Sequence, residues 1–189
     1  PPLRITPYLP FFPGEELCDG TVRLTRLTAA DAAELHRMLG DPQVLRHHLP
    51  PVRPTLEEVV RRCRYTGAWW LHGDRAEIAV RDARSGAFAG HLQLIDISPQ
   101  LGQATIGYSL LPEHRGRGLM TRAVSLLTRW AFTATPLQRI IAVTAPDNVR
   151  SRRVLERCGF TREALLRGAR PGPGGRRRDD LQWVLLLPW

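Results

Sequence analysis

The stretch Leu110-Leu111-Pro112-Glu113-His114-Arg115-Gly116-Arg117-Gly118-Leu119-Met120-Thr121 joins a β-like run, residues 104–110, to a helical run, residues 123–132. Its two glycines let a ligand approach the backbone closely, because no Cβ stands in the way. The N–H groups of a first helical turn have no partners inside the helix, and the helix dipole adds positive potential there. The stretch therefore predicts a seat for a phosphate or pyrophosphate group.

The spacing of the glycines excludes the common phosphate-binding loops. No Gly-x-x-x-x-Gly-Lys-Ser/Thr sequence is present, and Thr121 stands where a Gly-x-Gly-x-x-Gly turn has its third glycine. Arg115 and Arg117 are expected to donate to the phosphate as cations. The alternative is a surface turn rich in glycine and arginine that opens an amphipathic helix.

A second segment, Pro-Asp-Asn-Val-Arg-Ser-Arg-Arg-Val-Leu-Glu-Arg-Cys-Gly-Phe at residues 146–160, begins with a helix-capping pattern. Asp147 or Asn148 can accept hydrogen bonds from the first N–H groups of a helix. Gly159 is placed to end that helix in a left-handed turn. By itself, the segment predicts only a capped amphipathic helix.

Together, the two segments resemble the signature blocks of the GCN5-related N-acetyltransferases (GNAT). The first block reads Arg/Gln-x-x-Gly-x-Gly/Ala, which Arg115 and Gly118 match. Met120 departs from it in the manner of the ribosomal-protein N-acetyltransferase (RimJ/RimL-type) branch. The second block reads Asn-x-x-Ser/Ala, an apolar pair and Gly-Phe, and it matches Asn148, Ser151, Val154, Leu155, Gly159 and Phe160. The resemblance covers about residues 21 to 187.

The order of the periodic segments agrees with that family's fold. The pattern reads β-α-α-β-β-β-α-β-α-β-β, which indicates an α+β domain. The resemblance implies the GNAT acyl-CoA N-acyltransferase fold, with a mixed central sheet, flanking helices and splayed strands at 104–111 and 139–144. We expect a proline-rich arm over residues 1–20 and a single GNAT domain over residues 21–189.

Four finer predictions concern segments between these landmarks. Prolines predict a loop over residues 42–54, and a capping pattern starts a helix that is expected to run from Leu56 to about Tyr65. Trp69 and Trp70 would follow this helix, either as core residues or as a wall of the acceptor site. The segment 170–178, rich in arginine, glycine and proline, predicts a mobile basic loop.

Composition describes an ordinary globular chain except for its charge. Hydrophobic residues make up 43%, the net charge is +9, and all 27 basic residues are arginine. A basic surface suits the phosphates of coenzyme A, and equally RNA or a ribosomal surface, while a GC-rich coding bias explains the arginines as well. Three cysteines without metal-ligand spacing, no membrane-length apolar run and no signal pattern lead us to expect a cytoplasmic location.

The resemblance implies acetyl-CoA as co-substrate and no metal. Its pantetheine arm would lie between the splayed strands, and one backbone N–H would hold the thioester oxygen as it gains charge. Its pyrophosphate would lie on the amides of the glycine turn. The expected cofactor-binding residues are Ser109, Leu110, Leu111, Arg115, Gly116, Arg117, Gly118, Leu119, Met120, Thr121, Asn148 and Ser151.

The catalytic groups match the family less completely. Many relatives carry glutamate where this chain has Thr105, and others carry a tyrosine acid where it has Leu155. Ser151 is the candidate acid for the departing thiolate, whereas Tyr108 is expected to pack as an aromatic residue. The candidate bases are Asp96 and Glu113, with His114, Asp179 or a chain of waters as substitutes.

The expected reaction is acetyl transfer from acetyl-CoA to a primary amine by direct attack in a ternary complex. The acceptor is expected to be a peptide or protein α-amino group. The alternatives are a small-molecule or antibiotic-like amine, a longer acyl donor, or a non-catalytic module that binds coenzyme A or RNA. Contact with the ribosome or RNA, and a homodimer, are left open.

Overall fold

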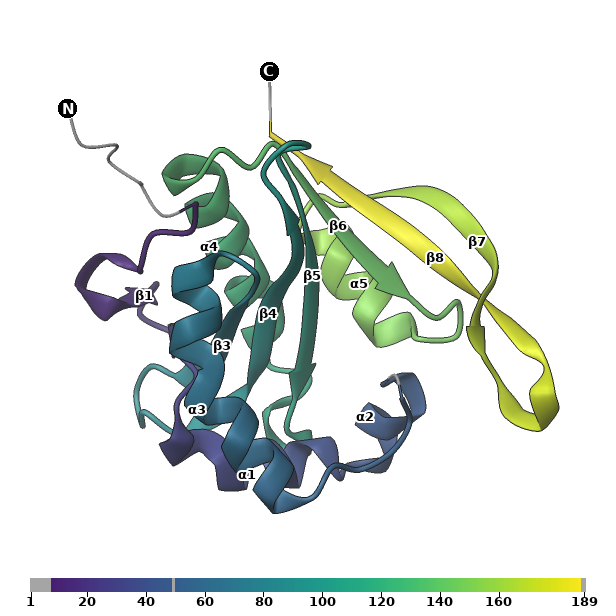
Figure 1. The fold of residues 1–189 in the computed structure, drawn as a ribbon, viewed down its shortest axis with the longest axis horizontal. Helices are drawn as coiled ribbons and strands as arrows, with labels where there is room; N and C mark the ends of the chain where they lie inside the picture. The colour runs from purple at the N-terminus through teal and green to yellow at the C-terminus, as the bar shows by residue number, and fades with distance from the viewer. Residues whose placement is uncertain (1–7, 49, 188–189) are drawn as a thin grey trace.

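The computed structural model describes residues 8–48 and 50–187 (Figure 1). Within these residues, eight strands form one sheet in the order β1-β2-β3-β4-β5-β6-β8-β7. They are β1 (Glu16–Cys18), β2 (Val22–Arg26), β3 (Ala76–Asp82), β4 (Phe88–Ser98), β5 (Gln103–Leu110), β6 (Arg139–Thr144), β7 (Thr161–Pro171) and β8 (Arg177–Leu186). Among the strands of the described residues, only β5 and β6 pair in parallel, so the predicted mixed sheet is confirmed.

Helices cover both faces of this sheet. They are α1 (Ala32–Leu39), α2 (Pro42–His47), α3 (Leu56–His72), α4 (Leu119–Ala134) and α5 (Val149–Arg157). Ile78 and Val80 of β3 pack in one core with Leu127 of α4, whereas Ala79 packs in a second core with Leu35 of α1 and with α3. Because alternate residues of a strand point to opposite faces, α4 lies on one face and α1 and α3 on the other (Figure 1).

The N-terminal segment belongs to the body of the domain from its first described residues. Leu9 and Phe12 are buried. Phe12 packs edge-on against Trp70 and Trp130, with ring centroids 5.0 and 4.8 Å apart. The indole nitrogen of Trp70 donates to the carbonyl of Pro10 at 3.1 Å. Trp70 is therefore a core residue and not a wall of the acceptor site.

Two of the predicted boundaries between helix and loop were wrong. The helix that starts at the capping box of Thr55 and Glu58 does not end near Tyr65 but continues to its left-handed cap at Gly73, with φ 83°. The predicted loop over residues 42–54 contains α2, because Asp41 caps a short helix by accepting hydrogen bonds from two backbone N–H groups. Within the described residues, no helix is both long and apolar enough to cross a membrane.

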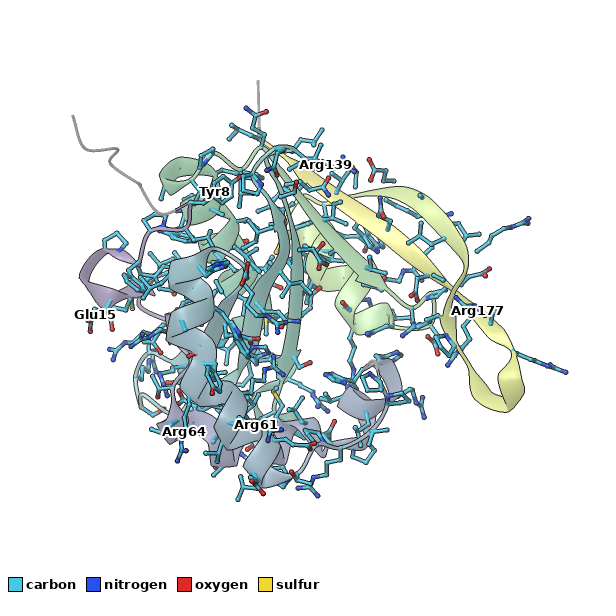
Figure 2. All side chains as sticks on the ribbon, viewed as in Figure 1. Tyr8, Glu15, Arg61, Arg64, Arg139 and Arg177 are labelled. Atoms are coloured by element: carbon cyan, nitrogen blue, oxygen red, sulfur yellow. The ribbon has the colours of Figure 1, made fainter. Side chains whose placement is uncertain are left out.

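The basic segment 170–178, predicted as a loop, is a loop only in its middle. Arg170 pairs with Arg178, and Pro171 pairs with Arg177, so both ends of the segment belong to strands of the β7–β8 hairpin, and residues 172–176 form the connection between them. In Figure 1 this hairpin projects away from the body of the domain. Figure 2 shows Arg61 and Arg64 on α3, far from Arg177 on the hairpin, so the basic side chains are distributed over separate parts of the molecule.

Candidate active site

Strands β5 and β6 separate partway along their length. Their parallel pairing joins residues 103–106 to residues 139–142. Beyond this point β5 continues to Leu110 beside β4, and β6 continues to Thr144 beside β8. The sheet is therefore split at one end, and backbone groups of β5 face the gap.

The orientation of the β5 backbone decides which groups face this gap. The N–H of Leu111 donates to the carbonyl of Ala89 at 2.9 Å, so Leu111 is turned toward β4. Successive residues of a strand present their N–H and C=O groups to opposite edges. Ser109 therefore also faces β4, whereas Tyr108 and Leu110 face the gap. Of the three residues expected to line the gap through their backbones, only Leu110 is turned that way, and Tyr108 is added.

The turn between β5 and α4 is open above two left-handed glycines. Gly116 has φ 75° and Gly118 has φ 74°, and no described atom lies within 4 Å of the position that a Cβ would take at either. The first intrahelical bond of α4 runs from the N–H of Arg122 to the carbonyl of Gly118 at 3.1 Å, so the N–H groups of residues 119–121 precede it. Among the described residues, no side chain caps this end. The turn therefore offers uncapped N–H groups and room for an anion.

The Arg115 guanidinium is already bound within the protein. It donates to the carbonyl of Leu110 at 2.9 Å, to Oε1 of Gln43 at 2.9 Å and to Oδ1 of Asp41 at 2.7 Å. Partial burial opposes the ionisation of Asp41, but the bond from Arg115 and two backbone N–H groups hold its pKa below its usual value. The expectation that this side chain binds phosphate is therefore corrected: Arg115 clamps the end of β5 to α2.

Replacing Arg115 with alanine should reduce the free energy of unfolding by about 1.5–3 kcal/mol, because Asp41 then stays partly buried without its cation. Acetyl-CoA affinity should change little by comparison. Urea unfolding and isothermal titration measure the two effects. Arg117→Ala is the matched control for stability, since the Arg117 side chain is 55% exposed and its guanidinium lies 3.5 Å from Asp82. An Arg115→Ala protein as stable as this control would contradict the clamp.

Tyr108 links β5 to α5 across the gap. Its hydroxyl donates to the carbonyl of Ser151 at 3.1 Å and lies 2.9 Å from Oγ of the same serine. Asn148 caps α5 by accepting from the N–H of Ser151 at 3.2 Å, which fixes the serine in place. Burial raises the pKa of Tyr108, so the phenol keeps its proton at neutral pH. Sequence reasoning missed this pair, because an aromatic residue near the end of a strand usually indicates packing.

The candidate bases lie apart from this pair. Glu113 accepts from Arg37 at 2.6 Å, and this hydrogen bond lowers its pKa. Asp96 is exposed at an irregularity of β4 beside the part of β5 that is still paired with β6. Asp179 accepts a backbone N–H within the β7–β8 hairpin at 2.7 Å. The structure brings none of these three carboxylates beside Tyr108.

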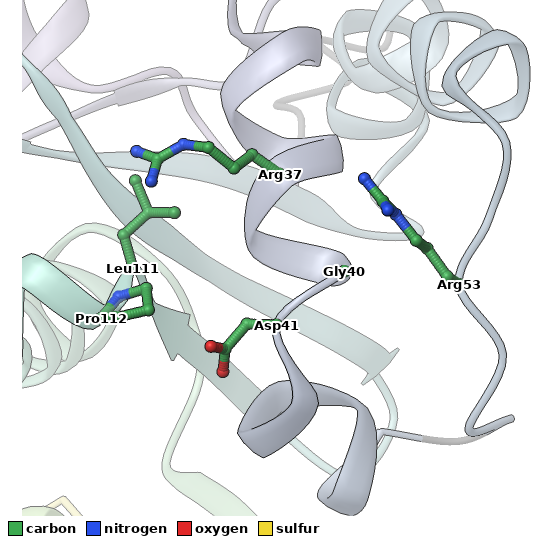
Figure 3. Close-up of a pocket in the computed structure, with 6 residues that line it drawn as sticks. All are labelled: Arg37, Gly40, Asp41, Arg53, Leu111 and Pro112. Carbon is green, nitrogen blue, oxygen red and sulfur yellow. The ribbon is translucent and has the colours of Figure 1, made fainter.

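A shallow pocket of about 210 Å³ opens beside the end of β5 (Figure 3). It is lined by Arg37, Gly40, Asp41, Arg53, Leu111 and Pro112. Arg53 lies over Gly40, where an added Cβ would come within 2.6 Å of its Nε. Within the described part of the chain, Arg53 has no carboxylate partner, and its nearest polar contact is Nδ1 of His36 at 3.4 Å. The pocket therefore carries positive charge.

A mixed sheet that splits between two parallel strands, with an open helix N-terminus at the split, defines a class of acyl-CoA-dependent acyltransferases. Residues 21–161 match the acetyltransferase (GNAT) domain, and the chain belongs to this family. It is an acetyl-CoA-dependent N-acetyltransferase, which confirms the family, the fold and the enzyme class predicted from the sequence.

Several similar proteins agree with this assignment. The chain is 27% identical over 146 residues to the uncharacterized N-acetyltransferase YoaA of Bacillus subtilis, covering 76% of this chain and 81% of YoaA. The structure of RimL, a ribosomal L7/L12 α-N-protein acetyltransferase in complex with coenzyme A, has a TM-score of 0.83 at 20% identity, covering 92% of this chain and 98% of RimL. The spermidine N-acetyltransferase of Vibrio cholerae, in complex with coenzyme A and spermine, has a TM-score of 0.76 at 21% identity, covering 89% and 96%.

Proposed function

We propose that the chain transfers acetyl groups from acetyl-CoA to the α-amino group of a peptide or protein. The observation that carries the proposal is the continuity of two features: the gap beyond residue 106 of β5 and the open N-terminus of α4. The pyrophosphate binds the N–H groups of residues 116–121, and the pantetheine arm extends from there into the gap. RimL, which acts on a protein α-amino group, shares this fold.

The β5 backbone offers a limited set of hydrogen bonds to the pantetheine arm. The carbonyl of Leu110 already accepts from Arg115. The groups left on the gap side are the N–H of Leu110 and both backbone groups of Tyr108. One of these two N–H groups holds the thioester oxygen as it gains negative charge. This assignment replaces Ser109 and Leu111 by Tyr108 in the proposed set.

Tyr108 and Ser151 supply the proton for the leaving group. The amine attacks the thioester carbon, the new C–N bond forms, and the C–S bond breaks to release a thiolate. The Tyr108 hydroxyl is protonated at neutral pH and protonates this sulfur, while Ser151 stabilises the phenolate and relays a proton back to it.

The charges near the gap favour an acceptor that is not a polycation. Asp41 is paired with Arg115, and Glu113 is paired with Arg37. Within the described residues, Arg53 has no carboxylate partner. A polyamine needs unpaired carboxylates, whereas a peptide brings a single amino group and several neutral amides. We therefore propose that the acceptor is a peptide and not a polyamine such as spermidine.

A peptide with a free N-terminal serine or alanine and an acidic second half should be acetylated with a kcat/KM roughly 100-fold above that for spermidine, a difference of about 2.7 kcal/mol. Thiol release from acetyl-CoA measures the rates, and mass spectrometry of the peptide locates the new amide. The same peptide with a blocked N-terminus is the control. Faster acetylation of spermidine would overturn the peptide assignment, and acetylation of small-molecule amines alone would establish the alternative acceptor.

A further inference from the structure

A buried charged cluster lies under α3, on the sheet face opposite α4. Glu77 is fully buried, and His91 is 5% exposed. Nε2 of His91 contacts Oε2 of Glu77, Arg62 donates to both carboxylate oxygens at 2.9 Å, and Nε of Arg75 lies 3.3 Å from Oε1. Removing such charges from water costs several kcal/mol per ion before pairing, so a cluster that served only to fill the core would be energetically unfavourable compared with apolar residues.

The strand register places this cluster next to the gap. Ala79 of β3 lies opposite His91 of β4, and His91 lies opposite Ser109 of β5. Residues directly opposite each other on one face have Cβ atoms about 4.5–5.5 Å apart. Ser109 lies beyond residue 106, where β5 leaves β6. His91 is therefore one strand away from the gap.

His91 lies on the face of the sheet from which the acceptor amine can reach the gap. The pyrophosphate seat lies at the N-terminus of α4, which packs on the opposite face. If the thioester enters the gap from the face covered by α4, the amine can approach it from the opposite face, which α1 and α3 cover. Burying the acceptor there brings its amino group toward the Ser109 and His91 side chains.

The surroundings of His91 fix its protonation. Burial opposes the ionisation of Glu77, but His91 and Arg62 hold its pKa down to about 2, so Glu77 is a carboxylate at neutral pH. Burial lowers the pKa of His91, so the ring is neutral and shares the proton on Nε2 with Glu77. The charged groups that face the ring are Glu77 from β3, Arg62 from α3 and Arg75 before β3, while α1 contributes the apolar Leu35 and its neighbours.

Nδ1 of the ring is then a proton acceptor. Among residues 8–48 and 50–187, the contact with Glu77 is the one hydrogen bond recorded for the His91 side chain. A neutral imidazole with one nitrogen bound to a carboxylate and the other unprotonated has the arrangement of a general base and its orienting group. The carboxylate also stabilises the imidazolium that forms when Nδ1 takes a proton.

We propose that His91, positioned by Glu77, accepts the proton that the acceptor amine loses as it attacks acetyl-CoA, directly or through one water. This inference rests on the proposed function. As the C–N bond forms, the amine proton moves to Nδ1 of His91; as the C–S bond breaks, the thiolate takes a proton from Tyr108. His91 then releases its proton to water, and Tyr108 regains one through Ser151, so both groups return to their starting states.

The substitution His91→Gln tests the proposal. The glutamine Nε2 can still donate to Glu77, but the side chain cannot accept a proton from an ammonium group. We expect kcat to fall about 100-fold, the usual contribution of a general base. The acetyl-CoA Kd and the melting temperature should stay near those of the unmodified protein. His72→Gln is the matched control, because His72 is 77% exposed and pairs with Asp74.

The pH profile separates a base from a structural residue. In the unmodified enzyme kcat should rise with pH as His91 loses its proton. The midpoint of this rise should lie below the ordinary histidine pKa of about 6.5, because burial lowers the pKa of His91. In His91→Gln the limb should disappear. The proposal is overturned if the kcat of His91→Gln stays within about threefold of the unmodified value and the acidic limb of its pH profile persists. A threefold change is smaller than the tenfold change that corresponds to about 1.4 kcal/mol.

A second measurement applies if His91→Gln does not fold. In the unmodified protein with coenzyme A bound, the ¹⁵N resonances of His91 should titrate at the same pH as the acidic limb of kcat. A clear mismatch overturns the proposal. Failure of the unmodified enzyme to acetylate any peptide refutes the proposed function, whereas a fully active His91→Gln refutes only the role of His91.

Discussion

Replacing Gly118 with valine should lower the affinity for acetyl-CoA at least about 100-fold, equivalent to roughly 2.7 kcal/mol. A Cβ at φ 74° costs about 1–2 kcal/mol of backbone strain. The valine methyl groups would also fill the open space above the turn, which holds no described atom within 4 Å of the Cβ position. That space is where we place the pyrophosphate. Isothermal titration with acetyl-CoA measures the loss directly.

Gly174→Val is the matched control for backbone strain. Gly174 also has a positive φ, 65°, and no described atom lies within 4 Å of its Cβ position. It lies in the connection between β7 and β8, at the end of the hairpin that projects away from the body of the domain (Figure 1). The control should lose comparable stability and keep its affinity for acetyl-CoA. Equal affinities of the two variants would show that the turn does not bind the pyrophosphate.

Replacing Tyr108 with phenylalanine should reduce kcat about 100-fold while leaving the acetyl-CoA Kd almost unchanged, because the thiolate loses its proton donor. The ring and its packing remain, and only the hydroxyl that contacts Ser151 is removed. Single-turnover thiol release measures the chemical step separately from product release. Unchanged single-turnover rates in Tyr108→Phe would exclude the tyrosine as the acid.

The partner substitution Ser151→Ala tests whether the two hydroxyls act together. If they form one relay, the double variant should be scarcely slower than Tyr108→Phe alone, because groups that act as a unit are not additive. Multiplied losses would instead mean that each hydroxyl acts independently.

The elements that the sequence predicts best are those defined by neighbouring residues. The boundaries of β6 at residues 139–144 agree with the prediction, and Asn148 and Gly159 begin and end α5 as their types indicate. The glycine turn is local in the same sense, because a strand, two left-handed glycines and a helix follow one another directly. Local chemistry is enough to predict such features.

The functions of single side chains depend on residues far away in the chain. Arg115 binds Asp41, which lies 74 residues before it, and Tyr108 binds Ser151, which lies 43 residues after it. A guanidinium fits a carboxylate and a phosphate equally well, so the turn sequence cannot distinguish these partners. The pairing of Glu77 with His91 likewise follows from strand register, which no short motif specifies.

Composition predicted the segment 170–178 only in part. Glycine, proline and arginine dominate residues 170–178 and are typical of a loop. Residues 170, 171, 177 and 178 nevertheless pair across the β7–β8 hairpin, and residues 172–176 connect its strands. Residue type alone does not show where such pairing stops, because β-propensity depends on context.

The split sheet has a mechanical consequence. Strands β6, β8 and β7 join the other five strands through a seam of only four residue pairs between β5 and β6. A ligand that hydrogen-bonds to both β5 and β6 across the gap would extend this contact and connect the two halves of the sheet. We therefore expect bound acetyl-CoA to stabilise the contact between the two halves of the sheet, and this stabilisation to be lost when coenzyme A leaves.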